Sequence, residues 1–348
     1  MTIYVTYFDC NFLTRGLACL ESLVTRSATA PRILVLALDA GCANVLARLW
    51  PAIGRGSELE IMTLEALERE HYALGAAKAT RSALEYYFTL TPFVCAEALA
   101  RTRENEYAVY IDADIFFFQD PDIALKAADG ASIGLVEHRF PESFHHYAKL
   151  YGRFNVGWIA FRAAPETQAC IARWQKECLE FCGDRPELGG YGDQKYLDAW
   201  PAQMKSLKIL DHSGINLAPW NFARHRLARG NDNEIKVDGS DVIFFHFSRL
   251  RRRGDSLYEA SFTEYGPFNE LLCSEIYIPY LVVLDRIESS IFEIAGFRPP
   301  RKLLRMPLLK WSRWFIFWPW RALRVLFRRR IIFRDGRLLS CWQSLPYA

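Results

Sequence analysis

The sequence predicts an α/β fold in which a parallel sheet is covered by helices on both faces. Short apolar runs rich in Val, Ile, Leu and Tyr recur along the chain, and helical stretches separate consecutive runs. Strands that are apolar throughout, rather than alternating with polar residues, indicate a sheet that is buried on both faces. Hydrophobic residues make up 51% and charged residues 24% of the 348 residues, so the chain can bury a large core.

The first half gives a regular alternation of elements in chain order. Strands are expected at 3–8, 32–38, 59–65 and 107–111, and helical segments at 13–24, 44–50 and Thr80 to Arg101. This order predicts a Rossmann-like arrangement. The motifs G-x-G-x-x-G and G-x-x-x-x-G-K-[ST] are both missing from the sequence, which argues against a dinucleotide enzyme and against a P-loop ATPase.

The second half continues with less regular spacing. Strands are expected at 131–138, 154–162, 207–212 and 241–248, a helix at 165–182, and loops at 187–200 and 213–225. Residues Glu259 to Gly296 are expected to form further helix. The predicted domains are a main domain over 1–255, a helical extension over 256–297 and a basic aromatic tail over 298–348.

The tail carries a charge that the net value of +3 hides. Thirteen Lys or Arg and one acid, Asp335, lie between Arg298 and Arg337, so the rest of the chain is acidic. The longest uncharged piece of the basic run from Arg301 to Arg334 has seven residues, Trp314 to Trp320, and crossing a bilayer needs about 20. We expect a helix that lies on an anionic membrane surface, with packing on the body or binding to another protein as alternatives. Nucleic acid is not expected as a partner.

The cysteines and the N-terminus predict a cytoplasmic protein attached peripherally to the inner face of the membrane. Nine cysteines are scattered without a C-x-x-C motif, and an odd number cannot pair completely, so reduced thiols are expected. Cys178 and Cys182, at helical spacing, are expected to be core thiols rather than a metal pair. The first residues read as a strand and lack the layout of a signal peptide.

Two carboxylates, Asp112 and Asp114, follow the apolar strand "YAVYI" with one residue between them. Side chains two residues apart on an extended backbone project to the same side, and ligands of open α/β sheets bind beyond the carboxyl ends of the strands. Mg²⁺ or Mn²⁺ would suit such a site, and turn or cap carboxylates are the alternative. His246, near the end of another apolar strand, is a third candidate ligand or else a core histidine.

Four motifs in order carry a family resemblance: the strand-end D-x-D, "RFNVGWIAFR", "GYGDQKYLDAW" and "HFS". From about Ile3 to Arg249 the chain resembles GT-A-fold glycosyltransferases, most closely family eight and its bacterial relatives. The resemblance implies a mixed, mostly parallel central sheet flanked by helices. It also implies metal-dependent transfer of a sugar from a nucleoside-diphosphate sugar, mostly a UDP-sugar, with retention of configuration. A cell-surface glycan or a lipid-linked molecule would be the acceptor.

The resemblance also assigns roles residue by residue. Asp114 and His246 would bind the metal directly, and Asp112 would lie on the ribose side of the metal. The remaining positions would bind the nucleotide (Thr6, Tyr7, Asp9), the donor sugar (Asn155) and the anomeric centre (Asp193, Gln194). Asp193 also fits a helix N-cap. Trp220 and His225 are candidates for the acceptor side, although Trp220 fits the core equally well.

Two departures concern the positive charge that the diphosphate needs. Family eight usually has an Arg before the Pro of the long helix, where this chain has Phe88 and Thr89. The lysine segment that usually follows the late His is replaced by "SRLRRRGDSLYE". We expect Arg249, Arg251 or Arg252 to neutralise the diphosphate, or else to continue the basic surface.

Two further functions are alternatives to the transferase. A phosphohydrolase of the haloacid dehalogenase type also uses a strand-end D-x-D, but it normally has Thr or Ser two residues after the second Asp, where Phe116 stands. A catalytically silent GT-A-like protein that docks other proteins at the membrane is the other alternative. The intact set of Asp112, Asp114, Asp193 and His246 favours the enzyme.

Overall fold

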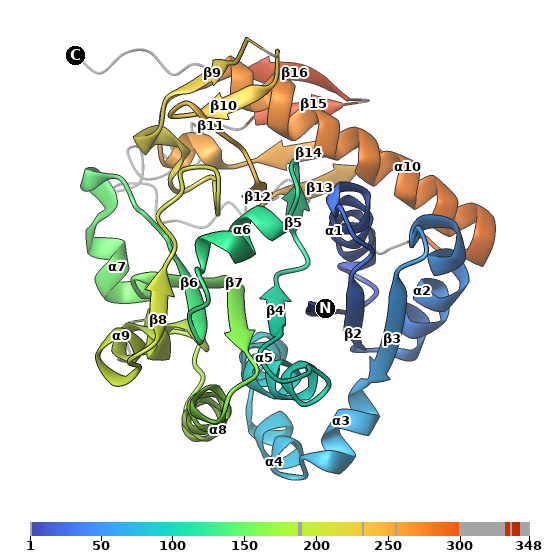
Figure 1. The fold of residues 1–348 in the computed structure, drawn as a ribbon. Helices are drawn as coiled ribbons and strands as arrows, with labels where there is room; N and C mark the ends of the chain where they lie inside the picture. Colours follow the sequence, from blue (N-terminus) through green and yellow to red (C-terminus); the bar gives the residue numbers. More distant parts are fainter. Residues whose placement is uncertain are drawn as a thin grey trace, which may run out of the picture.

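A seven-stranded sheet forms the centre of the molecule. The computed structural model describes residues 2–186, 190–231, 233–254, 256–298, 331–334 and 336–341. The strand order of the sheet is β3-β2-β1-β4-β7-β6-β8 (Figure 1). These strands are β1 (Ile3–Phe8), β2 (Arg32–Ala37), β3 (Glu58–Thr63), β4 (Tyr107–Ile111), β6 (Ile133–Glu137), β7 (Phe154–Arg162) and β8 (Leu207–Ile209). Only the two pairings of β7 are antiparallel in this sheet, so the predicted mixed, mostly parallel sheet is confirmed.

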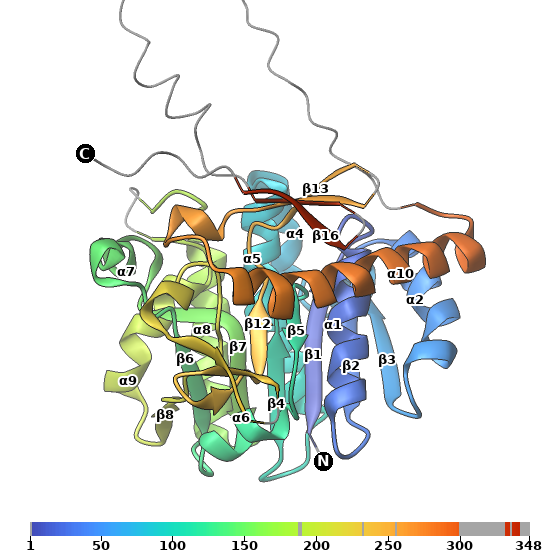
Figure 2. The same ribbon diagram turned by 90° about the horizontal axis from the view of Figure 1, so that it is seen from above.

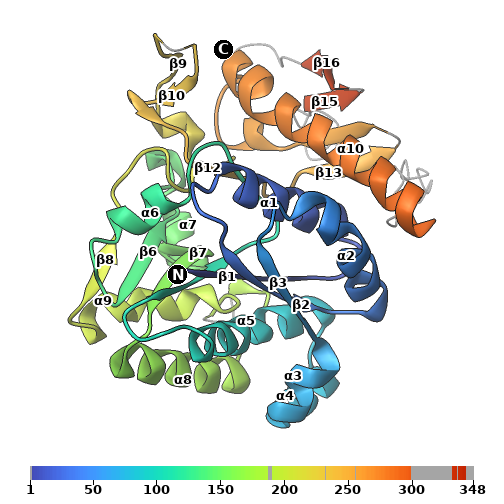
Figure 3. The same ribbon diagram turned by 45° about the vertical axis from the view of Figure 1, so that its right-hand side comes forward.

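Helices cover both faces of this sheet. Helices α1 (Leu13–Arg26), α2 (Ala40–Ile53) and α10 (Ile278–Ala295) pack on one face, and α5 (Ala83–Ala100) and α8 (Pro165–Glu180) pack on the other (Figure 3). Strand β1 shows why its sequence is apolar throughout: Tyr4 and Phe8 lie in the core on the α1 side, and Ile3 and Val5 lie in the core on the α5 side. The expected two-sided burial is therefore confirmed.

Shorter elements complete the body. The remaining helices are α3 (Leu64–Glu70), α4 (Ala73–Thr80), α6 (Asp122–Ala127), α7 (His146–Tyr151) and α9 (Trp200–Gln203). Strands β9 (Leu227–Arg229), β10 (Ile235–Val237) and β11 (Ser240–Asp241) form a small sheet, and β5 (Ile115–Phe117) pairs with β12 (Phe244–His246). A further sheet contains β13 (Arg251–Gly254), β14 (Leu257–Ala260), β15 (Ile331–Arg334) and β16 (Arg337–Cys341).

The start of α5 corrects the expected helix from Thr80 to Arg101. Thr80 is the last residue of α4, and α5 begins three residues later at Ala83. Ser82 explains the boundary: its hydroxyl accepts the N–H of Glu85 at 3.3 Å, and the Glu85 carboxylate accepts the N–H of Ser82 at 2.9 Å. This reciprocal capping box satisfies two backbone donors that the first turn leaves without partners.

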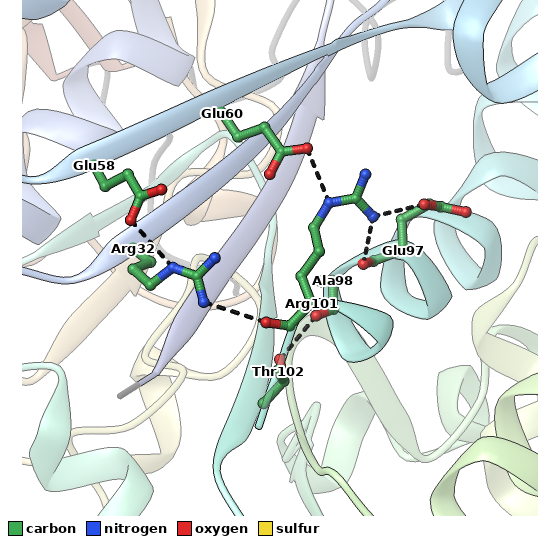
Figure 4. A network of polar contacts seen from close by, with 7 residues as sticks. All are labelled: Arg32, Glu58, Glu60, Glu97, Ala98, Arg101 and Thr102. Atoms are coloured by element: carbon green, nitrogen blue, oxygen red, sulfur yellow. Dashed lines mark hydrogen bonds and ion pairs between the residues drawn. The ribbon is translucent and has the colours of Figure 1, made fainter. Parts of the chain in front are cut away.

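The other end of α5 is tied to the sheet by ion pairs. Arg101, which follows the last residue of the helix, donates to Glu60 of β3 at 2.9 Å and to Glu97 of its own helix at 2.7 Å (Figure 4). Arg32 pairs with Glu58 at 3.3 Å and also donates to the carbonyl of Arg101 at 3.2 Å. Partly exposed pairs of this kind contribute about 0–1 kcal/mol each, so their main effect is to orient α5 on β2 and β3.

The segment from Glu259 to Gly296 is only partly helical, which corrects the prediction of a continuous helix. Residues Glu259 and Ala260 are the last two of strand β14, and a short 3₁₀ turn and a π-helix precede α10. The helix ends at Ala295 and is followed by Gly296, whose φ of 64° is the left-handed conformation that glycine adopts readily. Figure 2 shows α10 lying across α1 and α2, and its buried residues belong to the core of the body.

The predicted tail falls mostly outside the described residues. Its two described stretches are the strands β15 and β16, which extend the sheet of β13 and β14 and are not helical. Phe333 of β15 is fully buried and its ring stacks on Tyr277 with 5.7 Å between ring centroids. Residues 299–330 and 342–348 lie outside the described part, so the helical membrane-surface tail stays a prediction there. None of the described helices has the length and apolarity to span a membrane.

Candidate active site

The acidic pair lies where β4 ends, at the carboxyl edge of the sheet. The backbone N–H of Asp112 donates to the Gly157 carbonyl of β7 at 2.9 Å, and the Tyr110 hydroxyl donates to Asp112 Oδ1 at 2.8 Å. Asp112 keeps 32% of its side chain exposed and Asp114 keeps 14%. The apolar strand therefore fixes both carboxylates at the rim while leaving them accessible to a ligand.

His246 reaches the acidic pair through the pairing of β12 with β5. His246 lies opposite Ile115 in this antiparallel pair, and the next residue, Phe247, donates its N–H to the Asp114 carbonyl at 2.8 Å. His246 Nε2 is 3.0 Å from Asp114 Oδ1 and 3.5 Å from Asp112 Oδ2. One ligand atom from each of the three side chains lies within 4.8 Å of the others. The structure thus brings the three predicted metal ligands together.

The three groups shift one another's pKa values. Burial raises the pKa of Asp112 and outweighs the opposing effect of His246. Burial would also raise the pKa of Asp114, but His246 and Arg15 hold it below its usual value. Burial would lower the pKa of His246, but Asp114 and Asp112 hold it above its usual value. The two carboxylates therefore place negative charge around His246. A metal cation can balance this charge in place of a proton.

Asn155 contacts His246 because β7 bulges at this point. Leu135 of β6 pairs with Ile159, whereas the next residue, Val136, pairs with Asn155, so β7 has extra residues between these pairs. Such bulges re-aim side chains next to active sites. Gly157 leaves the room that is needed, since a Cβ there would lie 2.7 Å from both Asn155 Oδ1 and the His246 ring. Asn155 Oδ1 and His246 Nδ1 are 3.2 Å apart.

A hydrogen-bond chain continues from Asn155 to His138 and sets the proton on His246. His138 Nδ1 lies 3.0 Å from the Gly152 carbonyl, which can only accept, so Nδ1 donates. Burial lowers the pKa of His138 to about 3, so its Nε2 is unprotonated and accepts from Asn155 Nδ2 at 3.4 Å. Asn155 Oδ1 then faces His246 Nδ1 and accepts a hydrogen bond from its N–H. Nε2 of His246 faces the two carboxylates: when protonated it donates to Asp114 Oδ1 at 3.0 Å, and loss of that proton frees its lone pair for a metal ion.

The residues at this centre fit a divalent cation. Two carboxylates and one imidazole nitrogen are a donor set that Mn²⁺ and Mg²⁺ accept, and the anchored Nδ1 proton of His246 selects the correct tautomer for coordination through Nε2. Hydrogen bonds link His246 to Asn155, Asn155 to His138, and His138 to the Gly152 carbonyl. Metal-ligating histidines usually have such a hydrogen-bond partner on the ring nitrogen that does not bind the metal.

Asp193 lies in the same region, buried beside α5. Burial is the main cause that raises the pKa of Asp193 to about 7; a hydrogen bond from the Thr91 side chain opposes the rise, and the nearby charge of Asp112 adds to it. The Tyr7 hydroxyl lies 3.1 Å from the Thr91 hydroxyl, which joins the end of β1 to this group. Asp193 holds the N-cap position of the 3₁₀ turn Gln194–Ala199, but its side chain makes no capping hydrogen bond.

Two bacterial proteins are similar in sequence to this chain. No protein-family model matches the chain. The uncharacterised protein YfnD of Bacillus subtilis (strain 168) is 31% identical over 239 residues, which cover 67% of this chain and 76% of YfnD. The uncharacterised protein YfnF of the same organism is 30% identical over 254 residues, which cover 71% of this chain and 81% of YfnF. This chain belongs to the family of YfnD and YfnF.

Among solved structures, the galactosyltransferase LgtC in complex with donor and acceptor sugar analogues is similar in fold to the present chain. The two share 15% of their residues with a TM-score of 0.50, over 82% of this chain and 96% of LgtC. The chain therefore has the GT-A fold of glycosyltransferases, as the ordered motifs predicted.

The other residues predicted to bind the nucleotide, and Gln194, predicted for the anomeric centre, have the following surroundings in this GT-A fold. Thr6 is buried, and among the described residues nothing hydrogen-bonds its hydroxyl. Tyr7 donates to the Tyr87 carbonyl at 2.9 Å. Asp9 accepts from the backbone and side chain of Asn11, and Gln194 donates to the Tyr151 carbonyl at 2.8 Å. Their roles toward a nucleotide or a sugar stay predictions.

The three arginines predicted for the diphosphate are placed differently. Arg249 pairs with Glu264 at 3.2 Å and keeps 53% of its side chain exposed. Arg252 pairs with Glu288 of α10, and Arg251 is exposed on β13 opposite Glu259. None of the three contacts Asp112, Asp114 or His246 through any described hydrogen bond or ion pair.

The two acceptor candidates take structural positions. Trp220 is 7% exposed, lies edge-on to His246 with 5.0 Å between ring centroids, and donates to the His138 carbonyl at 2.9 Å. His225 pairs with Asp238 at 2.6 Å in the small sheet region. Trp220 thus supports the metal centre from the core, which was the alternative reading of that residue.

Sequence reasoning missed four residues of this site: Arg15, Thr91, His138 and Gly157. Only Gly157 carried a local signal, as a glycine inside an apolar strand, which often marks a bulge or a close backbone approach. A second acidic cluster, Glu70, His71 and Glu97, has donor atoms within 4.8 Å of one another. Glu97 is already engaged by Arg101 (Figure 4), so this cluster belongs to the ion-pair network of α5.

Proposed function

We propose that this chain is a metal-dependent glycosyltransferase that moves a sugar from a nucleoside-diphosphate sugar to a glycan or lipid-linked acceptor. The observation that carries the proposal is the convergence of Asp112, Asp114 and His246 at the carboxyl edge of a GT-A sheet. LgtC, with the same fold, is solved with donor and acceptor sugar analogues, which supports a nucleotide-sugar donor and a sugar acceptor. UDP is the nucleotide that the likeness to family eight implies.

The chemistry requires charge to be handled at two places. The bond between the anomeric carbon and the β-phosphate oxygen breaks, and its electron pair stays on the diphosphate. The acceptor oxygen bonds to the anomeric carbon, and its proton leaves with the diphosphate. A bound Mn²⁺ or Mg²⁺ supplies Lewis acidity to the leaving group. Asp193, with a pKa raised to about 7, offers a carboxyl near the anomeric centre, and retention of configuration is the outcome that the family likeness implies.

Thermal-shift and calorimetric titrations with nucleoside diphosphates, each with and without Mn²⁺, test the proposal. Nucleotide should add stability to the wild-type protein only when Mn²⁺ is present, because the metal joins the carboxylates to the diphosphate. Asp114→Ala should abolish this coupling, whereas Asp211→Ala, at an exposed acid outside the cluster, should retain it. A folded wild type without any metal-dependent stabilisation by these nucleotides contradicts the transferase assignment, and coupling that survives Asp114→Ala contradicts the site.

The basic run over 301–330 supports an acceptor at an anionic membrane surface, on the inner face of the membrane. Because β15 pairs with β14 and β16 pairs with β15, the test keeps these strands and reverses charge instead of truncating the chain. The triple variant Arg328→Glu, Arg329→Glu and Arg330→Glu should sediment less with phosphatidylglycerol vesicles than wild type, since each basic residue near such a surface contributes about 1 kcal/mol. Phosphatidylcholine vesicles are the control. Equal sedimentation of variant and wild type would exclude electrostatic attachment through this run.

A further inference from the structure

One face of α1 is directed at the metal centre. Cys19 Sγ donates to the Asp112 carbonyl at 3.7 Å, and Arg15 precedes Cys19 by four residues, so both lie on the same face of the helix. Strand β1 ends at the carboxyl edge of the sheet and α1 begins five residues later. Arg15, in the first turn of α1, is therefore closer to that edge than Cys19 by about 6 Å.

The Arg15 guanidinium is held by the segment that follows His246. Its Nη2 donates to the Leu250 carbonyl. Leu250 in turn donates its N–H to the Phe247 carbonyl at 3.3 Å, and Phe247 donates its N–H to the Asp114 carbonyl at 2.8 Å. The guanidinium also lies over the Phe12 ring, 4.7 Å from its centroid. Three consecutive hydrogen bonds thus link Arg15 to the second aspartate of the D-x-D.

Arg15 carries a positive charge that no described carboxylate pairs with. Among the described residues its one hydrogen-bond acceptor is the Leu250 carbonyl, whereas Arg249 pairs with Glu264 and Arg252 pairs with Glu288. The charge is therefore held at this edge of the sheet by a neutral acceptor and remains available to an anion.

We propose that Arg15 binds the departing diphosphate and supplies the positive charge that the missing family residues would have supplied. The inference rests on the proposed function. When the bond from the anomeric carbon to the β-phosphate oxygen breaks, the electron pair adds negative charge to the diphosphate, and the Arg15 guanidinium donates to its oxygens. The planar fork suits two phosphate oxygens at once, and the Phe12 ring keeps it oriented.

Calorimetric titration of the full chain with Mn²⁺ alone and with preformed Mn²⁺–pyrophosphate tests this role without knowledge of the nucleotide base. Arg15→Ala should weaken binding of Mn²⁺–pyrophosphate by about 10- to 100-fold, because a hydrogen-bonded ion pair with the phosphates is lost. The same variant should bind Mn²⁺ alone as tightly as wild type or more tightly, because a cation that repels the metal has been removed. Arg26→Ala, at an exposed arginine in the last turn of the same helix, is the matched control and should change neither affinity.

The opposite signs separate a binding role from a structural one. A variant that merely disturbs the site would lose affinity for Mn²⁺ and for Mn²⁺–pyrophosphate together, which would overturn the proposal. Unchanged binding of both would also overturn it, as would a loss seen in Arg249→Ala but not in Arg15→Ala. A wild type that binds Mn²⁺–pyrophosphate while Arg15→Ala has no effect leaves the proposed function standing. A wild type that does not bind Mn²⁺ refutes the metal-dependent function itself.

Discussion

At the scale of single residues, the geometry of the candidate metal centre includes a histidine, His138, that does not itself face the acidic pair. His138 is 5% exposed, stacks on Phe140 and accepts from Asn155 through Nε2. Without this acceptor the Asn155 amide can turn over, and its nitrogen would then face His246 Nδ1 and oppose the tautomer that coordinates metal. His138 is therefore a positioning residue that acts through Asn155.

His138→Phe tests this dependence while keeping an aromatic ring against Phe140. We expect the dissociation constant for Mn²⁺, measured by electron paramagnetic resonance, to rise about 10- to 100-fold, as is typical when an outer partner of a metal-ligating histidine is lost. His145→Phe, at an exposed histidine, should leave it unchanged. Equal Mn²⁺ affinity in His138→Phe and wild type would show that the hydrogen bonds from His138 through Asn155 do not set the tautomer of His246.

Asp193 predicts a pH dependence of stability with a definite sign. Its folded-state pKa of about 7 lies above the value of about 4 expected in the unfolded chain. Its contribution is therefore fully present below about pH 4 and is lost as the pH rises through about 7. Between pH 4 and pH 8 the free energy of unfolding of wild type should fall by about 4 kcal/mol relative to that of Asp193→Asn.

Urea titrations of both proteins across this pH range give the comparison. Asp129→Asn, at an exposed acid, serves as the control and should follow the wild-type curve. If Asp193→Asn and wild type showed parallel pH profiles, the carboxyl would not be buried in the uncharged form.

At the scale of elements, the bulge in β7 decides whether Asn155 can meet His246. The extra residues between Asn155 and Ile159 let β7 keep its pairing with β6 while it re-aims Asn155. The sequence predicted a strand at 154–162 correctly, and the structure gives the same bounds. Gly157 inside the strand was a local sign of a bulge. The shift in register was not predictable, because alternation is hidden in a strand that is buried on both faces.

Gly157→Ala should therefore affect the site more than the fold. The added Cβ would lie 2.7 Å from Asn155 Oδ1 and from His246, so these side chains must move apart. We expect a cost of about 1–3 kcal/mol in unfolding free energy and a loss of Mn²⁺ affinity of at least about tenfold. Gly75→Ala in α4 has open space for its Cβ and is the control, expected to retain Mn²⁺ affinity. Unaltered Mn²⁺ binding in Gly157→Ala would exclude the close contact.

At the scale of the whole molecule, α10, which comes late in the sequence, packs against α1 and α2 near the N-terminus. Tyr280, Leu284 and Ile287 of α10 lie in the same core as the α1 residues Leu17 and Leu20. The predicted boundary between a main domain and a helical extension thus crosses a continuous core. A helix that shares its core with the sheet unfolds together with it.

Leu284→Ala should lower the free energy of unfolding by about 2–5 kcal/mol, because it opens a cavity between α10 and the body. Val282→Ala, at a residue of the same helix that is 53% exposed, should change it by less than about 0.5 kcal/mol. Circular dichroism and tryptophan fluorescence in urea should report one coincident transition for both variants. Two separate transitions would mean that α10 unfolds as a unit of its own.

The sequence by itself determined the strands of the sheet, the place of Asp112 and Asp114 at a strand end, and the basic charge of residues 298–337. These features are local, since burial on both faces makes a strand apolar throughout and a strand end is read from a few neighbouring residues. Only the tertiary structure decided which residues meet the acidic pair. Asn155 and His246 are 91 residues apart, and Arg15 and Leu250 are 235 apart. Such contacts leave no periodic pattern in the sequence, because they arise only when β12 pairs with β5 and α1 packs against β5.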